Sequence, residues 1–248
     1  MLLESEALLM AAAIGLYLYD SSLLLYVNEG ILIPRGKQAW VVAFGSDRAR
    51  IMGKEVFVPN PLLPHRPLFR LSWKFEGIPT LSEGDWTLRR HTFGPLVPMV
   101  WGMAIALFAF LPLGLFTRLG ERMILVAILL LYLNIVFALL WLWLNRARFD
   151  LPGRRFAGLA FELLACSPFA VNLIRKISVG MSVDEDLVSA ACRLQNSDDW
   201  HTTRMEMMAR LDEEIEGEED DSKRALILKE HRRKLSERNA TCPPLKSL

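Results

Sequence analysis

The residues that could carry chemistry are few and widely separated along the chain. The four histidines are His65, His91, His201 and His231, and no two of them have the HxxxH or HExxH spacing of a zinc site. The sequence also lacks CxxC, GxSxG, a P-loop and GxGxxG. We therefore predict no catalytic residues, no metal ligands and no cofactor.

A second group of residues is suited to contacts between helices. Asn134 lies in the middle of a long apolar run, where its amide can bond either a neighbouring helix or its own backbone. Gly102 and Ala106 form a small-xxx-small pair, which lets another helix approach closely. We predict that Gly102, Ala106 and Asn134 are helix–helix contacts.

A third group is suited to binding a protein. Residues 212–221 hold eight acidic side chains in ten positions, a pattern typical of a solvated face or of a dock for a basic partner. An apolar stripe with 3–4 spacing comes just before it, and it could be core or an adaptable interface. The predicted docking residues are Trp200, Met207, Met208, Leu211, Glu213 and Glu214.

The composition indicates a membrane protein. The 248 residues are 52% hydrophobic with a mean hydropathy of +0.24, and the apolar residues are gathered in long uncharged runs. Such hydrophobicity excludes disorder for most of the chain, and a net charge of +1 argues against a nucleic-acid partner. Cys166, Cys192 and Cys242 are an odd count without close spacing, so a disulfide scaffold is not expected.

Two uncharged runs are long enough to cross a bilayer. Met123–Leu144 has 22 residues, which is about 33 Å of helix against a hydrocarbon core of about 30 Å. Residues 94–116 form the other run, in which Pro112 should kink the helix or end its regular part. Because the link between the runs is short, residues 94–144 are predicted to form an antiparallel transmembrane hairpin.

The N-terminal segment, residues 1–27, is predicted to be a transmembrane or interfacial helix. Asp20 interrupts its apolar run, which resumes over Leu23–Val27, so we expect a span over about residues 5–26, and an interfacial helix is the alternative. At membrane depth Asp20 would be a candidate proton or ion site. If the span ends there, its carboxylate is simply hydrated.

Residues 145–180 are predicted to form basic and apolar helices close to the membrane. Glu162 and Pro168 interrupt the apolar stretch 156–174. A charge inside a span costs about 2.5–3.5 kcal/mol, so two short helices on the membrane surface or on the cytoplasmic domain are favoured over a further span.

The remaining segments read as soluble. Residues 28–93 should form a β-rich insert, with strands near 38–44, 48–52, 55–58 and 68–73. Residues 181–240 should form an acidic helical tail, and residues 241–248 should be disordered. The expected fold class is therefore a mainly helical integral membrane protein with two to three spans, a small β-rich insert and a helical tail.

The distribution of charge predicts the orientation. Residues 1–180 carry a net +6 and residues 181–248 a net −5, and basic side chains flank the spans at 28–93 and after Leu144. The positive-inside rule then places the N-terminus outside and the insert and C-terminus in the cytoplasm. This layout is typical of bacterial inner-membrane proteins.

Three functions remain open from the sequence. The favoured one is a non-enzymatic anchor or scaffold that contacts membrane lipid and docks a cytoplasmic protein through its helical tail. One alternative is a small subunit of an oligomeric transporter or channel, assembled as a homo-oligomer through the helix–helix contacts. The other is a membrane-bound enzyme with its site in the 28–93 insert, around His65 and His91.

Overall fold

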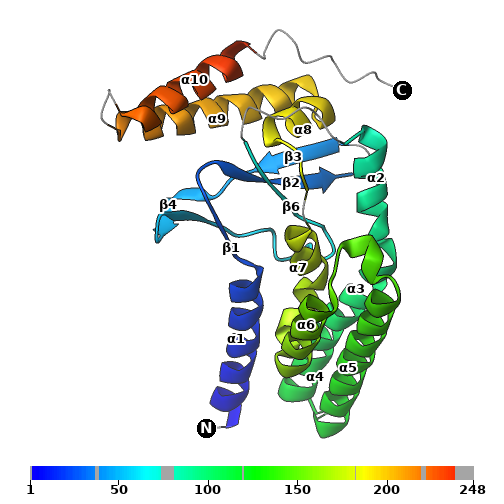
Figure 1. The fold of residues 1–248 in the computed structure, drawn as a ribbon. Helices are drawn as coiled ribbons and strands as arrows, with labels where there is room; N and C mark the ends of the chain where they lie inside the picture. Colours follow the sequence, from blue (N-terminus) through cyan, green and yellow to red (C-terminus); the bar gives the residue numbers. More distant parts are fainter. Residues whose placement is uncertain are drawn as a thin grey trace. The chain divides into compact units, whose positions relative to one another are not determined.

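The computed structural model describes residues 2–36, 39–73, 81–118, 120–181, 183–218 and 222–237, with side chains from Ser5 onward. The segment 241–248, predicted to be disordered, lies outside these residues. The chain forms two compact units that are interleaved along the sequence (Figure 1). Unit 1 comprises Met1–Leu23, Val56–Leu68 and Leu88–Ser182, and unit 2 comprises Leu24–Glu55, Phe69–Thr87 and Val183–Leu248.

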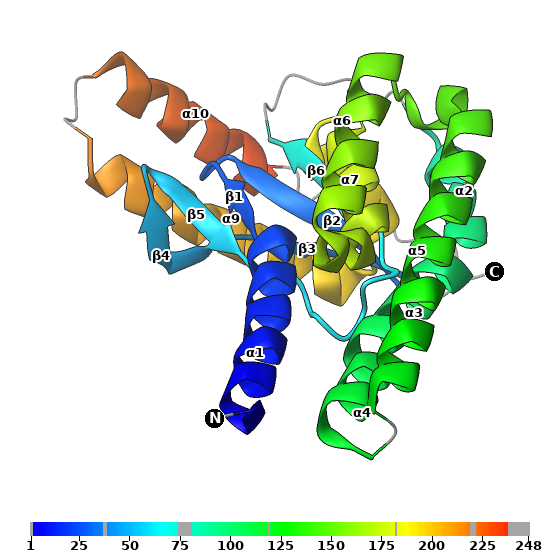
Figure 2. The ribbon, with the colours of Figure 1, turned by 90° about the horizontal axis from the view of Figure 1, so that it is seen from below.

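Unit 1 is helical. Its elements are α1 (Leu2–Ser21), η1 (Gly94–Leu96), α3 (Val97–Ile105), the π-helical turn η2 (Ala106–Phe110), α4 (Leu111–Phe116), α5 (Gly120–Leu144), η3 (Arg146–Phe149), α6 (Gly153–Ala165), η4 (Ser167–Asn172) and α7 (Leu173–Gly180). The α3–α4 rod packs against α5 as an antiparallel pair (Figure 2). α2 (Glu83–Thr92) precedes η1, and Glu83–Phe116 is one continuous helical rod.

The π turn explains how that rod passes Pro112. Proline has no amide hydrogen to donate, and its ring clashes with the carbonyl four residues earlier, here that of Phe108. The widened turn η2 covers Phe108 and relieves this clash, so the helix continues to Phe116. The predicted interruption of the regular α-helix is therefore present, in the form of a π turn.

Two helices in the described part of the chain are long and apolar enough to cross a membrane. They are Glu83–Phe116 and Gly120–Leu144. In the most apolar 18-residue segment of each helix, 33% and 28%, respectively, is buried inside the chain. The core helix of a soluble protein would be mostly buried, whereas α5 exposes side chains such as Leu125, Leu129 and Phe137. The mainly helical fold with small sheets is confirmed.

α1 is shorter than the helix predicted over 1–27. It ends at Ser21, where the Ser21 and Ser22 hydroxyls donate to the carbonyls of Leu18 and Tyr19 at 2.9 and 2.7 Å. These bonds occupy the last carbonyls of the helix, and the chain then turns into β1 (Leu23–Leu25). The prediction of a helix over residues 1–27 is therefore wrong for residues 22–27, which are not helical.

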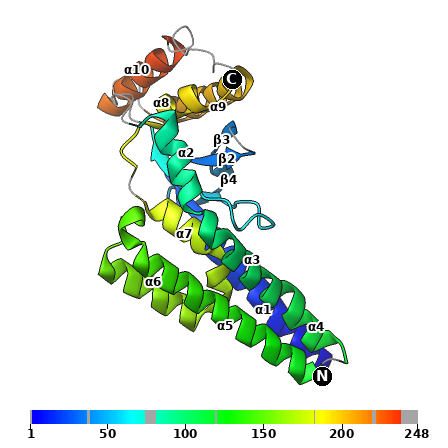
Figure 3. The same cartoon turned by 90° about the vertical axis from the view of Figure 1, so that its right-hand side faces the viewer.

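The stretch 156–174 is two helical pieces, as predicted, and they turn back on each other. α6 ends at Ala165 before Pro168, and η4 and α7 follow. α6 lies along α5: Phe156 packs on Trp143 with ring centroids 5.1 Å apart, and the Tyr132 hydroxyl donates to the Leu164 carbonyl at 3.3 Å (Figure 3). α6 therefore runs alongside α5 from near its C-terminal end to its middle.

Two three-stranded sheets contain the predicted strands. The orders are β1-β5-β4 and β3-β2-β6, built from β2 (Glu29–Arg35), β3 (Ala39–Ala43), β4 (Ser46–Ile51), β5 (Lys54–Phe57) and β6 (Phe69–Ser72). β2 was not predicted. It pairs antiparallel with β3 and with β6, so it is the central strand of its sheet.

The core of unit 2 is aromatic and is covered by helices. Trp40 packs on Trp86 and on Phe69, at centroid distances of 5.6 and 6.0 Å. α8 (Leu187–Leu194) lies against β2 and β3, and α9 (Ser197–Glu216) pairs with α10 (Lys223–Glu237). Asn196 caps α9, because its side-chain oxygen accepts from the Asp199 amide at 2.7 Å.

Candidate functional site

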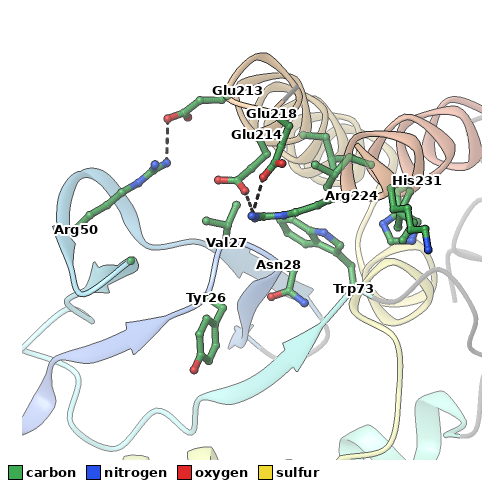
Figure 4. A pocket seen from close by; sticks show the side chains of 16 residues that line it. Tyr26, Val27, Asn28, Arg50, Trp73, Glu213, Glu214, Glu218, Arg224 and His231 are labelled. Carbon is green, nitrogen blue, oxygen red and sulfur yellow. Dashed lines mark hydrogen bonds and ion pairs between the residues drawn. The ribbon is translucent and has the colours of Figure 1, made fainter. Parts of the chain in front are cut away.

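A cavity with a volume of about 1010 Å³ lies within unit 2. Figure 4 shows side chains from two β-turn regions on one side and from α9 and α10 on the other. We call it the α9–α10 pocket. Its lining includes Tyr26, Asn28, Arg50, Trp73, Leu211 and Ile227.

Two tight turns position one side of the pocket. At the first turn, the Glu29 amide donates to the Tyr26 carbonyl at 2.9 Å. At the second, β4 and β5 are joined through Met52 and Gly53, both with positive φ (51° and 75°), the conformation of a two-residue hairpin turn. Glycine adopts it freely, whereas a methionine there is strained, and the Met52 side chain is 98% exposed beside the pocket.

Ion pairs form the charged rim. The Arg50 guanidinium lies 2.9 Å from the Glu213 carboxylate. Arg224 reaches two carboxylates, that of Glu214 at 2.8 Å and that of Glu218 at 2.7 Å. Figure 4 shows these three pairs along the edge formed by α9 and α10. Each is solvent-exposed on at least one side and contributes at most about 1 kcal/mol, so a partner charge can exchange with it at little cost.

The inner wall of the pocket is apolar. Trp73 and Leu211 are buried, and the Trp73 amide donates to the Asn28 carbonyl at 3.0 Å, which fixes the strand end that carries the indole. Ile227, on α10, is exposed and completes the apolar side. An apolar wall with a few polar groups at its edge is the usual character of a ligand or peptide site.

The lining combines apolar side chains with ionisable ones, which include Lys223 and His231. The lining has no cysteine, serine or threonine nucleophile. Across the described residues, no three histidine, cysteine, aspartate or glutamate side chains gather as a metal site would require. What the pocket offers is an apolar surface bordered by charges of both signs.

The structure divides the predicted docking residues. Trp200 and Met207 are buried in the interior of unit 2, and Met208 is half-buried. Leu211, Glu213 and Glu214 line the α9–α10 pocket. The half of the set nearer the end of α9 is therefore placed where a partner could meet it.

The predicted helix–helix contacts come together inside unit 1. A Cβ atom on Gly102 would lie 2.6–2.8 Å from the side-chain amide of Asn134, so α3 and α5 approach closely there. Ala106 is buried on the same rod. The Asn134 amide nitrogen donates to the Leu130 carbonyl of its own helix at 2.8 Å.

Asp20 lies in a polar cluster of unit 1. Its carboxylate contacts the Lys176 ammonium at 2.5 Å and accepts from the Asn172 amide at 3.0 Å. Lys176 also pairs with Glu162. Arg175, which is buried, donates to the carbonyls of Asn60 and Leu63 at 2.6 and 3.0 Å. Burial lowers the pKa of Arg175.

The two histidines of the enzyme alternative have different surroundings. His65 is half-buried and packs on Trp101 with ring centroids 5.5 Å apart. Burial, followed by the nearby charges of Arg66 and Arg175, lowers the pKa of His65. His91 is exposed near the end of α2.

Three comparisons with known proteins bear on the site. No family model, curated protein or solved structure matches the chain. An assignment of function therefore rests on the geometry alone.

Sequence reasoning predicted both turns on the strand side of the pocket but gave them no role in a site. The pairing of 48–52 with 55–58 through Gly53 was predicted, and residues 26–30 were considered as a hairpin corner, the alternative to a helix that continues to residue 26. Tyr26, Asn28 and Arg50 were not named as site residues. No local pattern shows that this hairpin lies opposite α9 and α10.

Proposed function

We propose that this chain is a membrane-anchored docking protein. The helices of unit 1 would insert into a bilayer, and the α9–α10 pocket of unit 2 would bind a cytoplasmic protein. The partner segment would place an apolar side chain against Trp73 and Ile227 and charged side chains at the ion-paired rim.

The single observation that carries the proposal is the exposed apolar surface of α5. The helix has 25 residues, and its outward side chains include Leu129, Leu133 and Phe137, each about half or more exposed. Soluble monomers rarely expose apolar patches larger than a few hundred Å², so a long apolar helix left uncovered favours contact with lipid.

The pocket supplies the docking half of the proposal. Its volume of about 1010 Å³ suits a peptide segment, and Met52 and Ile51 stand exposed on the hairpin beside it. A strained turn residue that is also an exposed apolar side chain is more consistent with binding than with stability.

Affinity capture from gently solubilised membranes tests the docking site with two matched variants. Ile227→Asp places a charge on the apolar wall of the pocket, whereas Leu226→Asp changes its neighbour on α10. Both side chains are similarly exposed, 56% and 59%, and only Ile227 lines the pocket. We expect Ile227→Asp to lose the captured partner and Leu226→Asp to retain it.

Equal capture by the two variants would place the partner elsewhere and contradict the docking site. These point changes are preferable to truncation at Asn196. Truncation there would remove the buried side chains of Trp200 and Met207 together with the pocket, so loss of a partner could reflect loss of the core of unit 2.

A further inference from the structure

A second cavity, of about 480 Å³, lies within unit 1. It is bounded by the end of α1, by one face of α6 and by α7. Its charged lining residues are Asp20, Arg155, Glu162, Arg175 and Lys176, and its apolar ones include Phe149, Leu159 and Ile177.

α6 turns its charged face toward this cavity and leaves apolar side chains outside. Arg155, Leu159 and Glu162 follow one another at helical spacing on the lining face. Phe161, by contrast, is 76% exposed and Leu164 is 43% exposed. The exposed apolar side chains of α6 are suited to contact with lipid, and the charged side chains that line the cavity are suited to a polar ligand.

Most of the charges that line the cavity are already paired. Lys176 lies between the carboxylates of Asp20 and Glu162. Arg175 donates to backbone carbonyls and to the side-chain oxygen of Asn172. Among the described residues, Arg155 has no acidic partner.

The Arg155 guanidinium lies against Gly180, which also lines the cavity. The guanidinium occupies the space that a Cβ atom on Gly180 would fill. Gly180 follows Lys176 by one helical turn of α7, so the unpaired guanidinium and the ammonium lie along the same wall. The formal charge of the five charged lining residues is +1, which favours an anion.

We propose that this cavity binds the phosphate group of an anionic phospholipid. The phosphate accepts hydrogen bonds from Arg155, as guanidinium groups favour, and an acyl chain lies against Phe149, Leu159 and Ile177. The apolar lining and the exposed apolar face of α6 favour a lipid over a water-soluble phosphate. The proposal rests on the membrane insertion proposed above and goes beyond partner docking.

Thermal unfolding of the full chain in a neutral detergent tests the site. Phosphatidylglycerol, phosphatidylcholine and inorganic phosphate are added separately. We expect phosphatidylglycerol alone to raise the Tm. Arg155→Gln should need about tenfold more phosphatidylglycerol for half the shift, which corresponds to about 1.4 kcal/mol.

A matched variant separates this site from general charge effects. Arg154→Gln removes the same charge from the neighbouring residue, which is also exposed but does not line the cavity, and should respond as the unaltered chain does.

Equal responses from all variants would overturn the site, and so would the absence of any phosphatidylglycerol shift. An equal Tm shift with inorganic phosphate would show that the cavity binds phosphate without the lipid, and would overturn the proposed phospholipid. Carbonate extraction of membranes keeps the two proposals apart. A chain that is released contradicts the membrane anchor itself, whereas a retained chain without the shift contradicts the lipid site alone.

Discussion

His65 gives unit 1 a specific dependence on pH. Burial lowers the pKa of His65 in the folded chain, whereas its unfolded pKa is about 6.5. The unfolded state therefore binds more protons than the folded state below about pH 6.5. The free energy of unfolding is therefore at its full value above that pH and falls as the pH is lowered. We expect the Tm in detergent to fall between pH 8 and pH 5.5, and to fall less in His65→Gln.

The exposed His91 is the matched control for that experiment. His91→Gln should retain the full fall in Tm, because its side chain is exposed near the end of α2. An identical pH profile for His65→Gln and the unaltered chain would contradict the assignment to His65.

Gly102 is the residue at which the α3–α5 packing is tightest. Gly102→Ala would place a methyl group 2.6–2.8 Å from the Asn134 amide, and overpacking of this kind costs about 1–3 kcal/mol. Unfolding in a denaturing detergent should show a lower free energy of unfolding for Gly102→Ala. Adding Asn134→Ala should restore most of the lost stability, because the shorter side chain leaves room for the methyl group.

Gly15→Ala is the control for this prediction. It lies in α1 with nothing near a new Cβ atom, so its stability should be unchanged or should rise by up to about 1 kcal/mol. A Gly102→Ala chain as stable as Gly15→Ala would contradict the close approach.

At the scale of elements, one buried ion pair fastens α9 to the strands of unit 2. Arg210 pairs with the buried Glu55 and donates to the Gly45 carbonyl at 2.7 Å. Arg210→Met leaves that carboxylate with Arg50 alone, at 3.4 Å, and should cost about 3 kcal/mol. Hydrogen exchange should show faster exchange of the α9 amides.

An exposed pair provides the comparison. Arg233, on α10, has a 59% exposed side chain between Glu230 and Glu237. Arg233→Met should change protection little, because exposed pairs contribute about 0–1 kcal/mol. Equal effects from the two variants would show that the Glu55 pair does not hold α9.

Elements with a strong local signal could be predicted from the sequence. The uncharged run 123–144 became α5, Gly217 ended α9, and Pro168 separated α6 from α7. β2 was missed, because its run EGILIPR ends in a proline and an arginine. Its identity as the central strand comes from pairing with β3 and β6, which no local pattern encodes.

The candidate sites depended on long-range packing in the same way. Leu211 was identified from an apolar stripe and Glu213 and Glu214 from an acidic run, whereas Tyr26 and Asn28, far away in sequence, complete the pocket. Likewise, Asp20 was noticed as a charge beside an apolar run, but its partner Lys176 is brought to it only by the turn between α6 and α7.

At the scale of the whole molecule, the orientation has two opposing indications. The basic flanks of α5 and of the 28–93 insert favour a cytoplasmic tail. Cys192, on α8, is disulfide-bonded, and disulfides are rare in a reducing cytoplasm. We retain the charge-based orientation as the prediction, because it rests on many residues.

Labelling with an impermeant maleimide in intact cells tests this orientation. Glu121→Cys, in the first turn of α5, should be labelled above the level of the unaltered chain, because the connection between α4 and α5 is predicted to lie outside. Glu216→Cys, an exposed position on α9, should be labelled only after lysis. The reverse pattern would place unit 2 outside, as the disulfide favours.

The most direct test of the membrane-anchored account is alkaline carbonate extraction followed by flotation with vesicles. We predict that the full chain stays with the membranes and floats. Val136→Lys, on the exposed face of α5, should reduce the inserted fraction, because a central charge costs about 2.5–3.5 kcal/mol. Release of the unaltered chain into the soluble fraction, with no difference from Val136→Lys, would contradict the account.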